Sequence, residues 1–373
     1  MPAAALRKDM ARCRRIVVKV GTNVLCDARG RLDIAAVERL ASQIAGVIRS
    51  GRSVVLVASG AIGSGLGELG LSTRPKTMPQ LQAAAAVGQG RLMQAFHDVF
   101  ARHHVMVAQV LLTRDDFEDR KRYLNIRNTL AALRQYDALP IINENDTVAV
   151  EEIRFGENDV LAALVTTMLG AELLVFLTNV DGLMKDGAVL DVVADVNGET
   201  LSLVRSERSA LGSGGMGSKL TAAAMVTQAG ELAAIANAAI PNVLERLLAG
   251  EKLGTVFAPA KRRLSSRRRW IGQAARPAGR IVVDDGAAKA LLAGGKSLLP
   301  SGITAVGGRF ARGDTIAVMD SAGREVARGL TNYSAAEIDR IKGLKTSAIA
   351  KVLGEKPYDE VIHRNNMTIR TTP

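Results

Sequence analysis

Two lysines of this chain stand in segments whose residue types suit the binding of phosphate groups. Lys19 lies near the end of the apolar run 16–20, and Lys219 ends the glycine-rich segment 212–219 (GSGGMGSK). Closely spaced glycines let backbone N–H groups approach an anion, and the helix expected over 220–228 would add the positive end of its dipole. The segment is not a Walker A loop, because the final lysine and serine of that pattern are transposed here. We interpret the two segments together as a site for nucleotide phosphates.

Two short clusters of acidic and amide side chains stand at expected element boundaries. The first, 143–146 (NEND), comes at the end of the strand-like run 140–143, and the second, 156–159 (GEND), opens the helix expected over 159–169. Either cluster alone is compatible with an ordinary strand-ending turn or a helix N-cap. Their occurrence in two successive loops favours a binding role, in which they recognise an ammonium group and lysine-bound phosphates.

Two further segments accompany strand-like runs. In 56–65 (LVASGAIGSG) a buried strand leads into a glycine-rich turn, whose backbone N–H groups suit a carboxylate or a phosphate. The turn is not a dinucleotide fingerprint, because the third glycine of that motif would fall at Glu68. The other segment, 178–182 (TNVDG), follows the run 173–178. Both segments are therefore candidate ligand-binding loops.

Short apolar runs alternate with longer Ala- and Leu-rich stretches up to about residue 260. The expected strands are 16–20, 53–58, 105–110, 140–143 and 173–178, and the expected helices are 34–50, 80–102, 124–136 and 159–169. This alternation predicts an α/β fold in which helices sandwich a mostly parallel sheet. Ligands bind such sheets at the carboxyl ends of the strands, where the polar or glycine-rich segments lie.

Charge and pattern divide the chain into three parts. The net charge is +12, and residues 261–276 contribute seven basic side chains and no acidic one. Short strand-like runs follow, at 279–284, 303–306, 315–319 and 325–330, with turns such as 307–308 and helices at 286–293 and 334–341. We predict a catalytic domain over 1–260, a basic linker over 261–276 and a small β-rich domain over 277–373. For the basic segment, a solvated linker whose arginines pair with acidic neighbours is favoured over a nucleic-acid patch.

The sequence shows no signal for export or membrane insertion. Residues 1–15 lack a continuous apolar core, and the best candidate span, 161–177, is interrupted by polar residues. Cys13 and Cys26 are too few for a disulfide framework or a four-cysteine metal site. Apolar residues make up 47% of the chain, which argues against a disordered or fibrous protein. We expect a soluble, cytoplasmic protein with no membrane partner.

The order of these segments resembles that of the amino acid kinase family, and the resemblance covers the whole chain. The shared motifs are Lys-Val-Gly-Thr at 19–22, Ser-Gly-Ala-Ile at 59–62, Leu-Thr-Arg at 112–114, Tyr-Leu-Asn at 123–125, Asn-Glu-Asn-Asp at 143–146, Gly-x-Asn-Asp at 156–159 and Gly-Gly-Met-x-Ser-Lys at 214–219. The tail from Pro277, with GRFARGD at 308–314, resembles a PUA domain. The resemblance implies the amino acid kinase fold followed by a PUA domain.

The resemblance also implies roles for individual residues. The catalytic residues would be Lys19, Lys219 and Asp159, with Asp159 holding the two lysines in position. ATP would contact Lys19, Thr178, Asn179, Ser213, Gly214, Gly215, Met216, Gly217, Ser218 and Lys219. Glutamate would lie against Ser59, Asp146 and Asn158. The family often has aspartate where this chain has Asn179, so a charge-based role at that position is in doubt.

The branch of the family that this chain most resembles acts on L-glutamate. The implied reaction transfers a phosphoryl group from ATP, with Mg²⁺, to the side-chain carboxylate, giving L-glutamyl 5-phosphate in the first step of proline biosynthesis. That carboxylate has an unperturbed pKa of about 4.3, so it is ionised at neutral pH and needs no general base. The resemblance further implies a homo-oligomer that proline inhibits.

Two alternatives stay open at the level of sequence. One is another kinase of the same fold, acting on acetylglutamate, aspartate, carbamate or a nucleoside monophosphate, although the acidic cluster 143–146 favours a substrate with a free amino group. The other is an RNA-binding protein, because PUA domains elsewhere bind RNA and the linker is basic. Aromatic residues make up only 3% of the chain, so stacking platforms for single strands are scarce.

Overall fold

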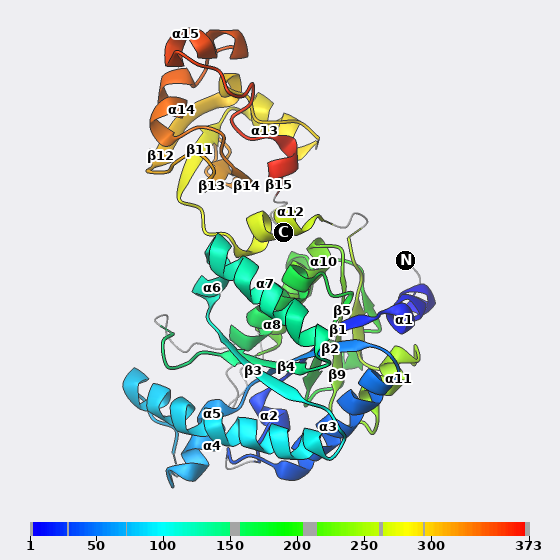
Figure 1. Cartoon of the computed structure of the whole chain (residues 1–373). Coiled ribbons are helices and arrows are strands. Elements are labelled where there is room, and N and C mark those ends of the chain that lie inside the picture. Colours follow the sequence, from blue (N-terminus) through cyan, green and yellow to red (C-terminus); the bar gives the residue numbers. More distant parts are fainter. Residues whose placement is uncertain are drawn as a thin grey trace. The chain divides into compact units, whose positions relative to one another are not determined.

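The computed structural model describes residues 3–27, 30–71, 73–149, 157–203, 215–260, 264–293 and 295–369. The chain forms two compact units (Figure 1). Unit 1 comprises Met1–Asp116 and Lys121–Arg263, and unit 2 comprises Phe117–Arg120 and Leu264–Pro373. Each unit has a sheet and a hydrophobic core of its own.

Unit 1 is built, in the part of the chain that the structure describes, on an eight-stranded sheet with the order β3-β4-β2-β1-β5-β9-β10-β8. Its strands are β1 (Arg15–Val20), β2 (Ser53–Ala58), β3 (Val107–Leu112), β4 (Leu139–Glu144), β5 (Leu173–Thr178), β8 (Val192–Val193), β9 (Leu232–Asn237) and β10 (Thr255–Phe257). The first six strands in the sheet order pair in parallel, and β10 runs antiparallel to β9. The prediction of a mostly parallel sheet is confirmed. A separate hairpin joins β6 (Met184–Lys185) to β7 (Ala188–Val189).

Helices cover both faces of this sheet (Figure 1). They are α1 (Ala3–Arg12), α2 (Thr22–Leu25), α3 (Ile34–Arg49), α4 (Ala61–Glu68), α5 (Met78–Ala101), α6 (Arg114–Glu118), α7 (Arg120–Gln135), α8 (Glu157–Leu169), α9 (Gly198–Ser202), α10 (Met216–Gln228) and α11 (Val243–Leu248). One core joins Ile16, Val18 and Val20 of β1 to residues of α1, α3, α5 and α11. Alternate strand residues face opposite sides, so Lys19 points to the other face, which α8 and α10 cover.

Most expected elements of unit 1 are present, with boundaries shifted by up to four residues. The segment after β2 differs, because α4 begins where the sequence predicts a glycine-rich turn. Its N-cap is Gly60, whose φ of 115° is readily adopted only by glycine and lets the chain turn from strand into helix. Strand β9 is also unpredicted, since its Ala-rich sequence (LAAIAN) carries no clear strand preference. Its pairing with β5 decides its conformation.

Unit 2 carries, among its described residues, a five-stranded sheet with the order β12-β11-β13-β14-β15. The strands are β11 (Gly279–Val283), β12 (Ile303–Gly308), β13 (Thr315–Met319), β14 (Glu325–Leu330) and β15 (Met367–Ile369). The helices are α12 (Ser266–Arg269), a π-helix (Trp270–Ala274), α13 (Asp285–Leu292), α14 (Ala335–Ile341) and α15 (Ile349–Leu353), with 3₁₀ turns at Pro300–Gly302, Thr346–Ala348 and Arg364–Asn366. The β-rich module is therefore present, but Gly307 and Gly308, which the sequence predicts as a turn, pair with β11 as the end of β12.

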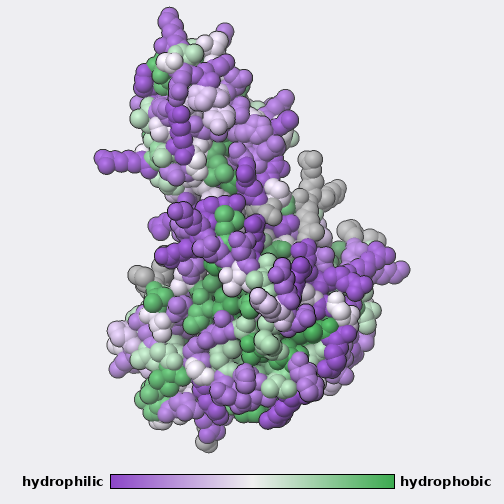
Figure 2. Space-filling view, viewed as in Figure 1, coloured by the Kyte–Doolittle hydropathy of each residue, from purple (hydrophilic) through white to green (hydrophobic). Residues whose placement is uncertain are grey.

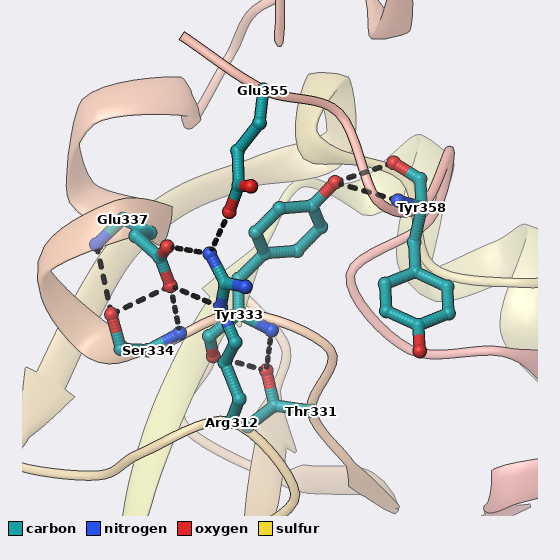
Figure 3. Close-up of polar contacts among 7 residues, drawn as sticks. All are labelled: Arg312, Thr331, Tyr333, Ser334, Glu337, Glu355 and Tyr358. Carbon is teal, nitrogen blue, oxygen red and sulfur yellow. Dashed lines mark hydrogen bonds and ion pairs between the residues drawn. The ribbon is translucent and has the colours of Figure 1, made fainter. Parts of the chain in front are cut away.

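A polar network fixes the start of α14 in unit 2 (Figure 3). The Arg312 guanidinium donates to Glu337 and Glu355 and lies 6.0 Å from the centre of the Tyr333 ring. Ser334 and Glu337 form a capping box at the helix N-terminus. The hydrogen bond from Arg312 lowers the pKa of Glu337 to about 2, so this network stays charged at neutral pH.

Part of the basic segment is folded and is not a solvated linker. Residues Ser266–Arg269 form α12, and Trp270 is buried, with its indole N–H donating to the carbonyl of Phe117 at 3.0 Å. Arg267 and Arg268 donate to a side-chain amide and a backbone carbonyl of unit 2, where acidic partners were expected. The first three residues of the segment lie outside the described residues, and the domain boundaries stay a prediction.

Within the described ranges, no helix combines the length and the apolar character needed to cross a bilayer.

On the face shown in Figure 2, hydrophobic patches interrupt the hydrophilic surface of unit 1, whereas unit 2 is mostly hydrophilic. Leu69, Leu71 and Val87 are among the large apolar side chains exposed in unit 1. They stand near the end of α4 and on α5.

Candidate active site

The carboxyl ends of four neighbouring parallel strands bring predicted site residues to one edge of the sheet. Strands β4, β2, β1 and β5 lie side by side in this order (Figure 1). Lys19 is the last residue but one of β1, Ser59 follows β2, and Thr178 ends β5. Strand β4 ends with Asn143 and Glu144, the first two residues of the predicted acidic cluster. Four segments that are distant in the sequence therefore meet at one edge.

Asp159 joins the two lysines that the sequence singles out. Its Oδ1 lies 2.6 Å from Lys19 Nζ, and its Oδ2 lies 3.3 Å from Lys219 Nζ. The Asp159 side chain is 0% exposed, and those of Lys19 and Lys219 are 5% and 8% exposed. Ser218 Oγ donates to Asp159 Oδ2 at 2.6 Å. One buried carboxylate thus fixes both ammonium groups, as the predicted role of Asp159 requires.

One carboxylate shared by two ammonium groups gives this cluster a net positive charge. Burial alone would raise the pKa of Asp159, but the charges of Lys19 and Lys219 and the hydrogen bonds from Lys19 and Ser218 bring it below its ordinary value. Burial lowers the pKa of Lys219, which the charge of Asp159 opposes and that of Lys19 reinforces. An arriving anion would offset the repulsion between the two ammonium groups. The cluster is therefore suited to a phosphate.

Helix α10 begins four residues earlier than the sequence predicts, so the last residues of the glycine-rich segment belong to the helix. Helix α10 begins at Met216 with Gly215 as its N-cap, and Lys219 stands in its first turn. The first N–H groups of a helix have no partner within the helix, and with the helix dipole they attract anions. Gly217 and Ser218 belong to the same turn. Of the predicted ATP-binding residues, Ser213 and Gly214 lie outside the described residues.

A chain of three amide side chains lies at the end of β4. Asn143 Nδ2 donates to Gln89 Oε1 at 2.8 Å, and Asn158 Nδ2 donates to Asn143 Oδ1 at 3.1 Å. The backbone N–H of Glu144 donates to the Oδ1 atoms of both asparagines, at 2.9 Å and 3.3 Å. Asn143 is only 2% exposed. The two acidic clusters of the sequence are therefore joined in space through Asn143 and Asn158.

Asp146 follows β4 and Ser59 follows β2, two strands that pair in the sheet. Burial raises the pKa of Asp146 to about 6, and the charge of Arg74 opposes this rise. Ser59 is buried, and its backbone N–H donates to the carbonyl of Val20 at 3.1 Å. Between the described side chains of Ser59 and Asp146 there is no direct hydrogen bond, so their shared role in binding glutamate stays a prediction.

Thr178 and Asn179 are in contact at the end of β5. Thr178 Oγ1 donates to Asn179 Oδ1 at 3.3 Å, and Thr178 is 8% exposed. An aspartate at position 179 would accept the same hydrogen bond. Asn179 therefore accepts this hydrogen bond without contributing a negative charge.

Sequence reasoning missed Gln89, Asn143 and Arg74. Asn143 lies inside the predicted cluster 143–146, where nothing distinguishes it from its neighbours. Gln89 stands in an Ala-rich helix without a motif around it, and Arg74 stands in the segment between α4 and α5. The contacts of all three depend on how distant segments pack, so no local pattern marks them.

Comparison with known proteins gives a family for each unit. The amino acid kinase family matches residues 14–237, and the PUA domain matches residues 279–353. A glutamate 5-kinase from Caldanaerobacter subterraneus subsp. tengcongensis is 49% identical over 362 residues, which cover 95% of this chain and 97% of the relative. A glutamate 5-kinase from Moorella thermoacetica is 46% identical over 370 residues, which cover 97% and 98%. The chain therefore belongs to the amino acid kinase family and carries a PUA domain in its C-terminal part.

Proposed function

We infer that this chain is an ATP-dependent kinase that phosphorylates the side-chain carboxylate of L-glutamate, the first step of proline biosynthesis. Relatives that match nearly its whole length are glutamate 5-kinases. In the structure, the observation that carries the proposal is the buried cluster of Lys19, Asp159 and Lys219 at the carboxyl edge of the sheet. Its excess positive charge is what a reaction between a carboxylate and a triphosphate requires.

Catalysis in this proposal is electrostatic. The attacking carboxylate is ionised at neutral pH, because its unperturbed pKa is about 4.3. Its oxygen forms a bond to the γ-phosphorus of ATP while the bond from that phosphorus to the β–γ bridging oxygen breaks, and ADP leaves. Lys19 and Lys219 stabilise the charge on the transferring phosphoryl group and on the bridging oxygen. Asp159 holds both lysines in place, so the site needs no rearrangement during the reaction.

Residues near the end of β4 recognise the amino acid. The carboxylate of Asp146 accepts hydrogen bonds from the substrate ammonium group, and Ser59 and Asn158 contact the rest of the molecule. A pKa of about 6 leaves Asp146 ionised at neutral pH. Acetylation of the amino group removes the positive charge that Asp146 attracts, so acetylglutamate should be a poor substrate.

The nucleotide lies at the other side of the lysine cluster. The first turn of α10 and the pair Thr178–Asn179 contact the ATP phosphates. Mg²⁺ enters as part of the substrate complex with ATP, since it is commonly held by phosphate oxygens and water. We also propose, from the family resemblance, a cytoplasmic homo-oligomer that proline inhibits. RNA binding is not part of the proposed function.

ADP release with a panel of acceptors tests the proposal. The protein is incubated with ATP, Mg²⁺ and either glutamate, acetylglutamate, aspartate, carbamate or UMP. Hydroxylamine is added to trap an acyl phosphate as its hydroxamate. We expect ADP release and hydroxamate with glutamate and little of either with the other acceptors. Preference for a different acceptor would contradict the proposed function.

A further inference from the structure

The amide chain at the end of β4 has a direction that one backbone group sets. A backbone N–H is always a donor, so the N–H of Glu144 requires acceptors, and the Oδ1 atoms of Asn143 and Asn158 face it. The Nδ2 group of Asn143 must then point away, toward Gln89, and Gln89 must offer its Oε1. The orientation of all three amides therefore follows from a group that cannot be reversed.

This direction leaves two amide N–H groups available to a ligand, one on Asn143 and one on Asn158. Asn158 Oδ1 faces Glu144, and one N–H of its Nδ2 is used by Asn143. In the described part of the chain the other N–H of Asn158 Nδ2 has no acceptor, and neither has the second N–H of Asn143 Nδ2. Amide donors suit a carboxylate and repel an ammonium group. Gln89, at the far end of the chain, accepts from Asn143 and adds a second contact that keeps this amide from rotating.

Helix α5 holds Gln89 rigidly, because its backbone packs tightly against α4 (Figure 1). A Cβ on the preceding residue, Gly88, would lie 1.8 Å from the carbonyl oxygen of Ala61. Seven residues earlier, on the same face of α5, Gln82 Nε2 donates to the carbonyl of Ala149 at 3.2 Å. Two glutamines of one helix thus contact this region, Gln89 at the end of β4 and Gln82 in the segment that follows it.

We propose that Gln89 is a positioning residue for substrate recognition. Through Asn143 it holds the Asn158 amide with its N–H toward the ligand, so that this amide binds a carboxylate of the amino acid while Asp146 takes the ammonium group. The inference rests on the proposed function, because it needs an amino acid substrate with a carboxylate. Gln89 itself does not touch the substrate.

The first test compares two substitutions of Gln89 with a matched control on the same helix. Gln89→Met removes the acceptor, and Gln89→Asn keeps an amide that is one methylene too short to reach Asn143. Either should raise KM for glutamate about tenfold, with kcat and KM for ATP within about twofold of the parent. Gln94→Met changes an exposed glutamine that bonds only to Asp98 among the described residues, and should change neither constant. A KM for glutamate within twofold of the parent in both Gln89 variants overturns the proposal.

A double-mutant cycle separates positioning from a general loss of structure. If Gln89 acts through Asn158, Gln89→Met should change KM for glutamate by less than about twofold in an Asn158→Ala background. An effect of Gln89→Met that is undiminished in that background overturns the proposal, because it means that Gln89 acts by another route. Because Gln89→Asn keeps a polar side chain at this half-buried position, it serves for the same cycle if Gln89→Met does not fold.

Two analogues of glutamate, tested as competitive inhibitors, identify the carboxylate that Asn158 binds. 4-Aminobutyrate lacks the α-carboxylate of glutamate, and L-2-aminobutyrate lacks the side-chain carboxylate. Gln89→Met should weaken only the inhibitor that retains the recognised carboxylate. Weakening of both or of neither overturns the proposal.

If the parent protein forms no hydroxamate with glutamate, the proposed function fails. A negative Gln89 result with an active parent concerns this inference alone.

Discussion

The cluster of Lys19, Asp159 and Lys219 is a costly arrangement for a protein interior. Moving an ion out of water costs several kcal/mol even after the protein relaxes, and attraction between the ions recovers this cost only in part. Here one negative charge faces two positive ones, so the repulsion between the lysines adds to the cost. Such a cluster becomes balanced when an anion joins it, which is the condition of a kinase site with ATP bound.

Replacement of either lysine tests this account. Lys19→Ala or Lys219→Ala should lower kcat roughly 100-fold or more, by analogy with the loss of one preorganised oxyanion donor. Steady-state kinetics with glutamate and ATP measure the change. Lys8→Ala, which alters an exposed lysine of α1, is the control and should leave kcat unchanged. Near-normal turnover in both active-site variants would remove these lysines from the mechanism.

Asp146 predicts a pH dependence of substrate capture. Burial raises its pKa to about 6, and only its ionised form attracts the substrate ammonium group. Protonation increases as the pH falls, so kcat/KM for glutamate should be level above about pH 7 and fall about tenfold per pH unit below about 6. Asp146→Ala should raise KM for glutamate far more than KM for ATP. In this variant, kcat/KM for glutamate should no longer fall in this way at low pH. If the fall of kcat/KM at low pH persists in the Asp146→Ala protein, a group other than Asp146 causes it.

At the scale of elements, the contact between α4 and α5 links two segments that are predicted to bind the substrate. Helix α4 begins two residues after Ser59, and α5 carries Gln89, which contacts the end of β4. Gly65 and Gly88 let the two backbones approach so closely that a Cβ on either would lie 1.8 Å from a carbonyl oxygen of the other helix. The glycines are therefore required by packing and not by backbone conformation.

A pair of glycines on α5 tests this contact. Gly88→Ala should push the helices apart and lower stability by about 1–3 kcal/mol, and the displacement of Gln89 should raise KM for glutamate. Gly90→Ala is the matched control, because a Cβ there meets no atom within 4 Å; it should stabilise α5 by about 0.5–1 kcal/mol. Thermal unfolding and glutamate kinetics measure both. Equal stability of the two variants would show that α4 and α5 can separate without cost.

The strands and long helices of this chain are predictable because their patterns are local. The apolar run of β5 predicts a strand, and the amphipathic stretch of α3 predicts a helix. The alternation of strands and helices along the chain implies a parallel sheet. The Ala-rich sequence of β9 lacks such a signal, and only its pairing with β5 makes it a strand. The glycine-rich start of α4 is predicted as a turn from sequence. Packing on α5 stabilises this segment as a helix, and that packing cannot be recognised in the local sequence.

Some residues of the candidate site are likewise predictable from local motifs, and others are not. Lys19 and Lys219 are recognisable because each stands in a short motif with chemical meaning. Their common partner Asp159 could be assigned only through family resemblance, and the pairing itself appears when β1, α8 and α10 come together. Gln89 has no motif at all. Its place in the amide chain depends on the packing of α5 against α3, α4 and β3.

At the scale of the whole molecule, every described residue of the candidate site belongs to unit 1, from Lys19 to Lys219. Unit 2 has its own hydrophobic core and the polar network around Arg312, which lies entirely within that unit (Figure 3). The short segment Phe117–Arg120, which lies between the two parts of unit 1 in the sequence, is the exception, because it clusters with unit 2 and Phe117 accepts the hydrogen bond from Trp270.

A protein that ends at Ala260 should therefore keep glutamate kinase activity. The chain up to that residue contains the whole sheet of unit 1 and the lysine cluster, so the groups that the reaction needs are all retained. Removal of Trp270 exposes the buried Phe117, which should lower solubility or stability more than turnover. Circular dichroism and gel filtration establish that the shortened protein is folded, and hydroxamate formation measures its activity. Full-length Trp270→Ala is the control that separates the loss of this one contact from the loss of unit 2. A folded protein of residues 1–260 that binds ATP but forms no hydroxamate, beside an active Trp270→Ala protein, would mean that unit 2 completes the active site.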